Sequence, residues 1–212
     1  MGLKERRERE IEERRRQILD AARAVLFESG MQGASINRIA KMAELGVGTI
    51  YSYFKSKEDI FIDLQEEGLS LLGDVIQEAA ARSENPAEKI RYIVRAYLDF
   101  SIEHKNYFDI INYFLSSPDI MFTANLKRQV HEHGSRILSH VVDAVQSGVQ
   151  QGVFKGVDAN RYAVMLWANM NGLIQFKKLE NTILIGDNYD DLCEYAIERL
   201  IDLLLLETRE RR

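Results

Sequence analysis

The chain has 212 residues, of which 46% are hydrophobic and 29% are charged, a balance typical of an ordinary globular protein. The N-terminal residues lack the apolar core of a secretory signal, and no stretch approaches the ~18 uninterrupted apolar residues that span a bilayer, so we expect a cytoplasmic protein. A single cysteine, Cys193, excludes an internal disulfide and a multi-cysteine metal site. Only two prolines occur, which favours long helices.

The formal net charge of −5 is unevenly distributed. Residues 1–57 contain 12 Lys or Arg and 8 Asp or Glu, whereas residues 58–212 contain 16 Lys or Arg and 25 Asp or Glu. A basic end on an acidic body fits a nucleic-acid contact confined to that end. Unevenly spread solvated charge is the other interpretation of this pattern.

Residues 1–16 form a charged tail with three Glu and Arg pairs at i,i+4 spacing, which favours an extension of the first helix into solvent. Arg14, Arg15 and Arg16 then either line a solvated helix or contact the DNA backbone or minor groove. The first helix itself is predicted to begin before residue 17 and to end near Ser29-Gly30, where Gly30 suits a left-handed closing residue. Its apolar stripe repeats at helical spacing: Ile18, Ala21, Ala22, Val25 and Leu26.

Residues 35–54 predict two short helices joined by a tight turn. Ser35 is a candidate N-cap for the first, whose apolar face consists of Ile36, Ile39, Ala40 and Ala43. The chain then turns through residues 44–46, and a second helix is predicted over residues 47–54. This is the organisation of a helix-turn-helix, whose second helix enters the major groove of DNA.

The ~100° step per residue of a helix separates the positions of this second helix. Ile50 and Phe54 point to the core, and Gly48 and Ser52 lie on the opposite side. Arg38, on the exposed face of the preceding helix, is a further candidate for a base or phosphate contact.

The segments GTIYSYFKSKEDIF and ILDAARAVLFESGMQGASINRIAKMA resemble the TetR family of transcriptional regulators over about residues 17–65. The resemblance implies an all-α fold with two domains. Residues 1–57 would form a three-helix, helix-turn-helix DNA-binding head, and residues 58–212 would form a ligand-binding and dimerisation body.

The resemblance also implies roles for single residues. Positions matching Val47, Gly48, Tyr51 and Ser52 face the groove, and positions matching Thr49, Tyr53 and Lys57 contact phosphates. Periodicity alone would bury Val47 and Tyr51, and we follow the resemblance here. One departure is the turn, where Gly46 replaces the hydroxyl N-cap of many family members.

Beyond Lys57 the pattern predicts long helices to about Arg82, from Pro86 to near His104, and over residues 106–115. Further helices are predicted up to Gly152, from the residue after Asp158 to about Leu179, and over about residues 188–207. Asp158 is a good N-cap for the second of these.

Aromatic and methionine side chains are frequent in these body helices, and such side chains can line an adaptable apolar cavity. Ordinary core packing is the alternative for each of them. The resemblance implies a pocket for a small, largely hydrophobic effector, and the candidate lining residues are Tyr97, Phe100, Phe108, Tyr113, Phe114, Met121, Phe122, Trp167 and Met170.

Two helices of the body are apolar over most of their circumference, so each must bury two sides. One side would pack within the chain and the other on a second subunit, as the resemblance implies; intrachain core is the alternative. The candidate interface residues are Met165, Met170, Leu173, Ile174, Ile197, Leu200, Ile201 and Leu204. A homodimer would place two recognition helices on a palindromic operator.

We therefore expect a DNA-binding regulator, a repressor released by ligand, with no cofactor, no metal and no membrane partner. Four histidines without matching carboxylate or cysteine spacing do not form a metal motif. The alternatives are a ligand-blind helical regulator or interaction module and, less favoured, a helical enzyme.

Overall fold

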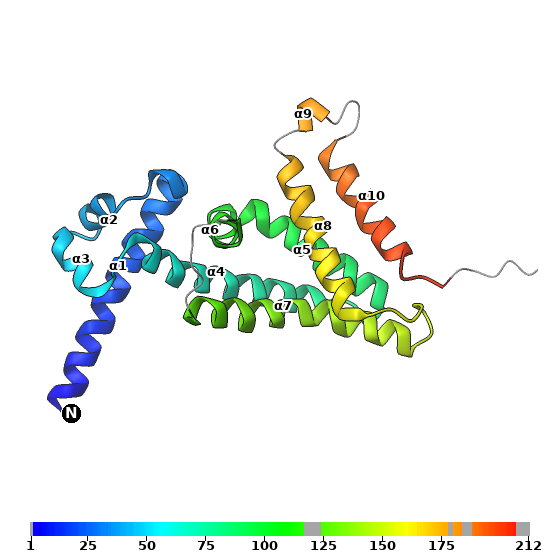
Figure 1. Ribbon diagram of the computed structural model, residues 1–212, viewed down its shortest axis with the longest axis horizontal. Helices are drawn as coiled ribbons and strands as arrows, with labels where there is room; N and C mark the ends of the chain where they lie inside the picture. The colour runs from blue at the N-terminus through cyan, green and yellow to red at the C-terminus, as the bar shows by residue number, and fades with distance from the viewer. Residues whose placement is uncertain (1, 117–123, 178–179, 184–187, 207–212) are drawn as a thin grey trace, which may run out of the picture. The chain divides into compact units, whose positions relative to one another are not determined.

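The computed structural model describes residues 2–116, 124–177, 180–183 and 188–206. These residues form helices, with one isolated β-bridge between Phe154 and Leu205, which confirms the predicted all-α class (Figure 1). In this part of the chain, no helix combines the length and the apolar character needed to cross a membrane.

The helices follow the predicted order closely. They are α1 (Leu3–Gly33), α2 (Ile36–Met42), α3 (Val47–Tyr53), α4 (Lys57–Ala80), α5 (Pro86–Glu103), α6 (Lys105–Ser116), α7 (Ala124–Gln150), α8 (Ala159–Phe176), α9 (Glu180–Ile183) and α10 (Tyr189–Asp202).

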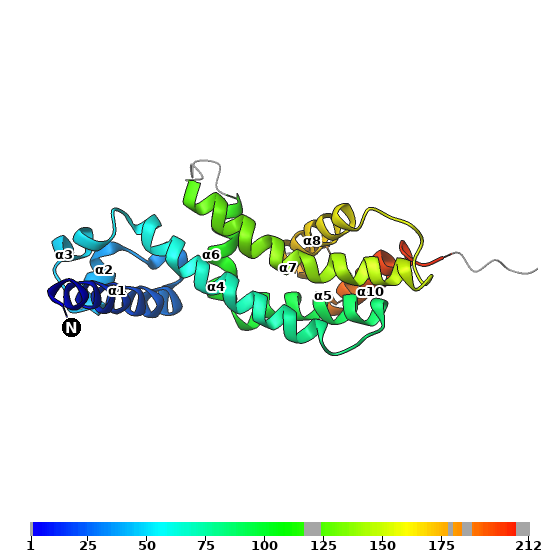
Figure 2. The same ribbon diagram turned by 90° about the horizontal axis from the view of Figure 1, so that it is seen from below.

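The chain divides into two compact units, which we call the first and second unit. The first comprises residues 1–70 and 104–127, and the second comprises residues 71–103 and 128–212. The predicted boundary after residue 57 falls at the start of α4, whereas the first compact unit continues along α4 and includes α6. Within the first unit, α2 and α3 lie beside α1 in both views (Figures 1 and 2).

The core of the first unit contains the whole predicted stripe of α1, from Ile18 to Leu26. Ile39, Ile50 and Phe54 meet this stripe and are 0%, 0% and 3% exposed. Two short helices cannot bury enough apolar surface by themselves, so α1 and the start of α4 are required to form their core.

The end of α1 differs from the prediction. Gly30 has φ 64° and ψ −176°, so its φ is positive as expected but its ψ is not that of a left-handed helix. One more helical turn follows, to Gly33. Glycine permits this interruption because it has no Cβ.

The predicted starts of two body helices, at Asp158 and Pro86, are confirmed, and a third helix has a cap that was not predicted. The Asp158 carboxylate accepts a hydrogen bond from the Arg161 backbone N–H, and α5 begins at Pro86. The Asn188 side chain caps α10 by accepting a hydrogen bond from the backbone N–H of Asp191.

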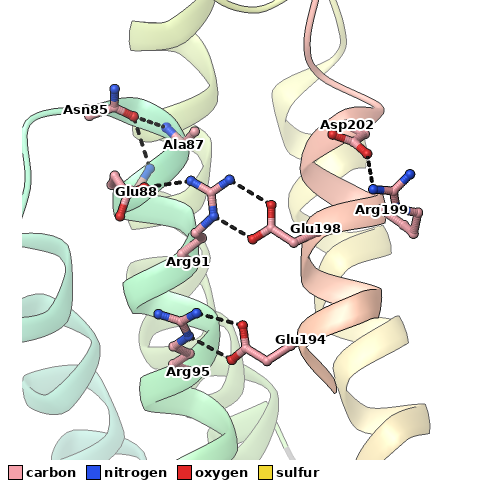
Figure 3. Close-up of polar contacts among 9 residues, drawn as sticks. All are labelled: Asn85, Ala87, Glu88, Arg91, Arg95, Glu194, Glu198, Arg199 and Asp202. Atoms are coloured by element: carbon pink, nitrogen blue, oxygen red, sulfur yellow. Dashed lines mark hydrogen bonds and ion pairs between the residues drawn. The ribbon is translucent and has the colours of Figure 1, made fainter. Parts of the chain in front are cut away.

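Within the second unit, α5 and α10 lie side by side and are joined by two bidentate ion pairs (Figure 3). Arg91 contacts Glu198 at 2.6 and 2.8 Å, and Arg95, one turn later on α5, contacts Glu194, one turn earlier on α10. The opposite order of the partners shows that the two helices run antiparallel.

Candidate nucleic-acid interface and effector cavity

The turn between α2 and α3 is fixed by backbone hydrogen bonds. The N–H of Leu45 donates to the carbonyl of Ala40 at 2.9 Å, and the N–H of Glu44 donates to that of Lys41 at 3.2 Å. This is a Schellman motif, and Glu44 occupies its left-handed position with φ 55°. A non-glycine residue at that position carries a conformational cost.

Two polar side chains of α1 hold the C-terminal ends of α2 and α3. Gln17 donates from Nε2 to the Ala43 carbonyl at 2.8 Å, and Arg15 donates from Nη1 to the Tyr53 carbonyl at 3.0 Å. The Arg15 guanidinium also pairs with Asp63 at 2.7 Å and lies 4.3 Å from the ring centroid of Phe54. Arg15 is therefore a structural clamp, which corrects both interpretations offered for it from the sequence.

The positions of Arg15 and Gln17 could have been found from their spacing in the sequence relative to the apolar stripe of α1. Arg15 lies three residues before Ile18, and Gln17 lies four residues before Ala21, so both lie on the same side of α1 as its buried stripe. Burial raises the pKa of the Asp63 carboxyl, and the charge and hydrogen bond of Arg15 oppose that rise. Arg15 thus helps to keep Asp63 ionised within the unit.

One face of α3 is open to solvent. Val47 and Tyr51 are 37% and 53% exposed, and Gly48 and Ser52 are exposed as well, whereas Ile50 is fully buried. The exposure of Val47 and Tyr51 agrees with the family resemblance and differs from periodicity alone. Because the helix ends are held by α1, this face is presented on a fixed support.

No neighbour of Gly48 in the described part of the subunit requires glycine at this position. Apart from its own helix backbone, a Cβ at Gly48 would meet no described heavy atom within 4 Å. Glycine inside a helix costs about 1 kcal/mol relative to alanine. The N-cap Gly46 also provides no side-chain hydrogen bond, so α3 lacks the cap that a hydroxyl would supply.

The candidate phosphate contacts lie around this face. Thr49, Tyr53 and Lys57 are half-buried, and Lys57 Nζ lies 3.5 Å from the Ala34 carbonyl. Arg38 is exposed and pairs with Glu28 at 2.9 Å. Exposed ion pairs contribute little stability, so exchanging Glu28 for a phosphate costs little.

The second unit contains an apolar cavity of about 40 Å³ between α4, α5, α7 and α8. Its walls are Ile76, Ile93, Val94, Tyr97, Ile137, Leu138, Val141, Ala163, Leu166, Trp167 and Met170. This volume holds at most about three water-sized molecules.

The cavity separates the predicted pocket residues. Tyr97, Trp167 and Met170 line it, whereas Phe100 is buried but is not part of its wall. The side chain of Phe108, like Tyr113, belongs to the first unit, so these two do not share the cavity. Three further predicted positions lie outside the described side chains: Phe114, Met121 and Phe122.

A short polar chain borders the cavity. Trp167 Nε1 donates to the Tyr97 hydroxyl at 3.2 Å, and the distance from that hydroxyl to Asn171 Oδ1 is 3.1 Å. Burial raises the pKa of Tyr97 to about 12, so the phenol is neutral at physiological pH. This uncharged polar chain therefore lies beside the cavity, whose wall is apolar.

The candidate dimer residues need correction. Five are almost completely buried inside the subunit, because the inner face of α10 packs within the second unit and Met170 lines the cavity: Met170, Ile197, Leu200, Ile201 and Leu204. Such side chains have little surface left to bury against a partner. Met165 is 38% exposed, and Leu173 and Ile174 are half-buried.

Other apolar side chains of the two helices remain exposed and were missed. On α8 they include Val164 and Phe176, at 52% and 47%, and on α10 Tyr195, at 64%, with Leu203 just beyond the helix at 50%. Tyr195 and Leu203 are eight residues apart, a helical spacing that could have indicated an outer apolar face of α10 separate from the inner one.

The described residues contain no grouping of three potential metal ligands among His, Cys, Asp and Glu. Cys193 is buried, and its burial raises the pKa of the thiol, which disfavours the nucleophilic thiolate.

Comparisons with known proteins extend over both units. Residues 18–64 match the family model of bacterial regulatory proteins, tetR family, and residues 90–200 match that of the tetracyclin repressor-like, C-terminal domain. A fatty acid metabolism regulator protein of Bacillus subtilis (strain 168) is 26% identical over 156 residues, covering 73% of this chain and 78% of that protein.

Solved structures share the fold. The transcriptional regulator FadR from Bacillus subtilis, in complex with stearoyl-CoA, has a TM-score of 0.67 at 23% identity and covers 89% of this chain and 98% of its own. The fatty acid degradation regulator FadR from Bacillus halodurans has a TM-score of 0.65 at 22% identity, covering 94% and 97%.

Proposed function

The chain belongs to the TetR family of bacterial regulatory proteins, and we propose that it is a homodimeric repressor released from a palindromic operator by a hydrophobic effector. The observation that carries the DNA-binding part is the pair of faces on α3. Ile50 and Phe54 anchor the helix region in the core, while Val47, Gly48, Tyr51 and Ser52 are exposed on a supported surface.

The proposed contacts divide into two kinds. Val47 can discriminate bases through a thymine methyl group, and Gly48 allows the helix backbone to approach the duplex closely. The hydroxyls of Thr49 and Tyr53 and the ammonium of Lys57 would bind phosphates, which fixes the register of the protein without reading the sequence.

For the dimer, we propose the outer faces of α8 and α10 as the contact surface. Val164, Met165, Phe176, Tyr195 and Leu203 are exposed apolar side chains on these two neighbouring elements. Exposed apolar patches on a globular protein commonly mark interaction sites. A twofold pairing through this surface would present two α3 helices to half-sites ~34 Å apart.

The apolar cavity is the proposed effector site. At about 40 Å³ it cannot hold an alkyl chain without displacement of its wall, so ligand entry must select a different packing arrangement. Ile76, in the wall, belongs to α4, the helix that begins directly after the DNA-binding segment. Similarity to a fatty acid metabolism regulator supports an acyl compound as the ligand class.

The test is a titration of a fluorescent palindrome from the chain's own upstream region with purified protein, by anisotropy. We expect tight binding at low salt that weakens steeply with added salt, and a ~5–150-fold loss of affinity when stearoyl-CoA is added. Tyr51→Ala and Lys57→Ala should each abolish most of the specific binding.

Each part of the proposal can fail separately. Absence of salt-sensitive operator binding would contradict the regulator, and strictly monomeric protein by ultracentrifugation would contradict the dimer. Operator binding that ignores stearoyl-CoA and other acyl compounds would favour the ligand-blind regulator. Turnover of a substrate that survives Tyr51→Ala would point to an enzyme.

A further inference from the structure

One arginine of the second unit differs from its neighbours. Five arginines described there form ion pairs with carboxylates: Arg82, Arg91, Arg95, Arg161 and Arg199. Arg136 on α7 has no carboxylate within ion-pair distance in the described part of the chain. The residues of this unit, 71–103 and 128–212, include 18 acidic and 14 basic residues, so an arginine without an acidic partner is unusual there.

The position of this guanidinium depends on a glycine. A Cβ added at Gly73 of α4 would lie 2.4 Å from Arg136 Nη2 and 3.2 Å from its Cζ. The guanidinium therefore lies directly against the backbone of α4, and a larger residue at position 73 would make the flexible arginine side chain move away. Gly73 is inside a helix, where glycine costs about 1 kcal/mol relative to alanine, so this arrangement carries a stability cost.

The guanidinium is also adjacent to the apolar cavity. Ile137 follows Arg136 on α7, and Ile76 lies one helical turn after Gly73 on α4; both side chains line the cavity. A cation thus lies about one turn from the apolar wall, on the same two helices.

We propose that Arg136 binds the anionic group of an amphiphilic effector whose apolar chain enters the cavity. The inference rests on the proposed effector site and specifies the chemistry of its ligand. A planar guanidinium binds carboxylate or phosphate oxygens through two parallel hydrogen bonds, so either group fits. The other described arginines of this unit already pair with carboxylates, which leaves Arg136 as the described arginine most available to an anionic head group.

Trp167 provides a direct measurement, because it is the only tryptophan of the chain and lines the cavity. Its fluorescence would be titrated with stearate, stearoyl-CoA and uncharged 1-octadecanol, each below its aggregation limit. We expect wild-type protein to prefer at least one anionic probe over octadecanol. Arg136→Gln should lower the affinity for that anionic probe about tenfold or more and leave the affinity for octadecanol unchanged.

Two further variants separate the charge from the fold. Gly73→Ala keeps the arginine but displaces its guanidinium, so it should also lower the affinity for the same anionic probe. Arg161→Gln is the matched control, since its side chain is 89% exposed and lies on α8, and it should change none of the three affinities. If the affinity for stearate depends on Arg136, the ligand group is a carboxylate. If only the affinity for stearoyl-CoA depends on Arg136, the ligand group is a phosphate.

The inference is overturned if wild-type protein binds octadecanol as tightly as both anions. It is also overturned if Arg136→Gln changes the affinities for all three probes equally, or changes none of them. Operator binding measured on the same samples distinguishes the failures. Intact operator binding with no charge selectivity removes only this subsite, whereas wild-type protein that binds neither operator nor any probe removes the proposed function as well.

Discussion

The first unit uses polar side chains of α1 to fix its helices, whereas the second unit surrounds a cavity with apolar side chains. Arg15 and Gln17 hold the ends of α3 and α2, and Arg23 pairs with Glu67 of α4 at 2.8 Å. In the second unit the space between α4, α5, α7 and α8 is lined by residues such as Ile76 and Leu166. Directional hydrogen bonds hold one geometry, while apolar packing around a void can rearrange.

The difference suits the two tasks of a ligand-controlled regulator. The surface that reads DNA must keep a fixed geometry, because half-site spacing is set by the duplex. The site that senses a ligand must have a second packing arrangement, because a ligand shifts an equilibrium only through its different affinity for two states. The following predictions test this contrast, from the largest expected effect to the smallest.

Removal of the α1 clamp should have the largest effect. Arg15→Ala deletes the hydrogen bond to the Tyr53 carbonyl and leaves Asp63 partly buried without its partner. We expect the free energy of unfolding, measured by urea titration, to fall by about 2 kcal/mol. The neighbouring Arg16→Ala, at an exposed position, should change it by less than about 0.5 kcal/mol; equal losses would contradict the clamp.

Filling the open position on α3 should separate stability from DNA binding. Gly48→Ala has room within the subunit, so we expect the free energy of unfolding to rise by about 1 kcal/mol while operator affinity falls about tenfold. Gly134→Ala on α7, where a Cβ also meets no described atom within 4 Å, is the control. It should add the same stability and leave operator affinity unchanged.

Relief of the strained turn should stabilise the first unit modestly. Glu44→Gly removes the cost of a left-handed backbone at φ 55°. The expected gain in the free energy of unfolding is about 0.5–1 kcal/mol, because the greater chain entropy of unfolded glycine offsets part of the benefit. Glu44→Ala keeps the strain and should gain nothing comparable.

The ion pairs between α5 and α10 should make the smallest contribution. The hydrogen bonds from Arg91 lower the pKa of Glu198 below its ordinary value of 4.5. The resulting stability is therefore complete above that value and is lost as the pH falls through the lower, folded-state pKa. Since Glu198 is 39% exposed, we expect only a few tenths of a kcal/mol.

The measurement is the free energy of unfolding of wild-type protein and Glu198→Gln between about pH 3 and pH 7. The two should differ at neutral pH and converge in acid. Glu84→Gln, at a side chain that is 97% exposed, should follow wild-type protein throughout; a Glu198→Gln difference that grows in acid would refute the sign.

The sequence by itself determined the helices, their caps and the DNA-reading segment. Ser35, Asp158 and Asn188 act through backbone groups three residues away, and the stripe from Ile18 to Leu26 repeats within one helix, so neighbouring residues contain this information. The family motif likewise identified the exposed face of α3, where periodicity alone would have buried Val47 and Tyr51.

Only the tertiary structure decided which of two apolar faces is internal. Ile197 and Leu200 are buried and Tyr195 and Leu203 are exposed, although all lie in one apolar region, because the choice depends on which neighbouring helices pack against it. The contact of Arg15 with Asp63 and that of Arg136 with Gly73 were equally hidden, since they join residues 48 and 63 positions apart. Local patterns determine helices, whereas contacts distant in sequence exist only after the helices have packed.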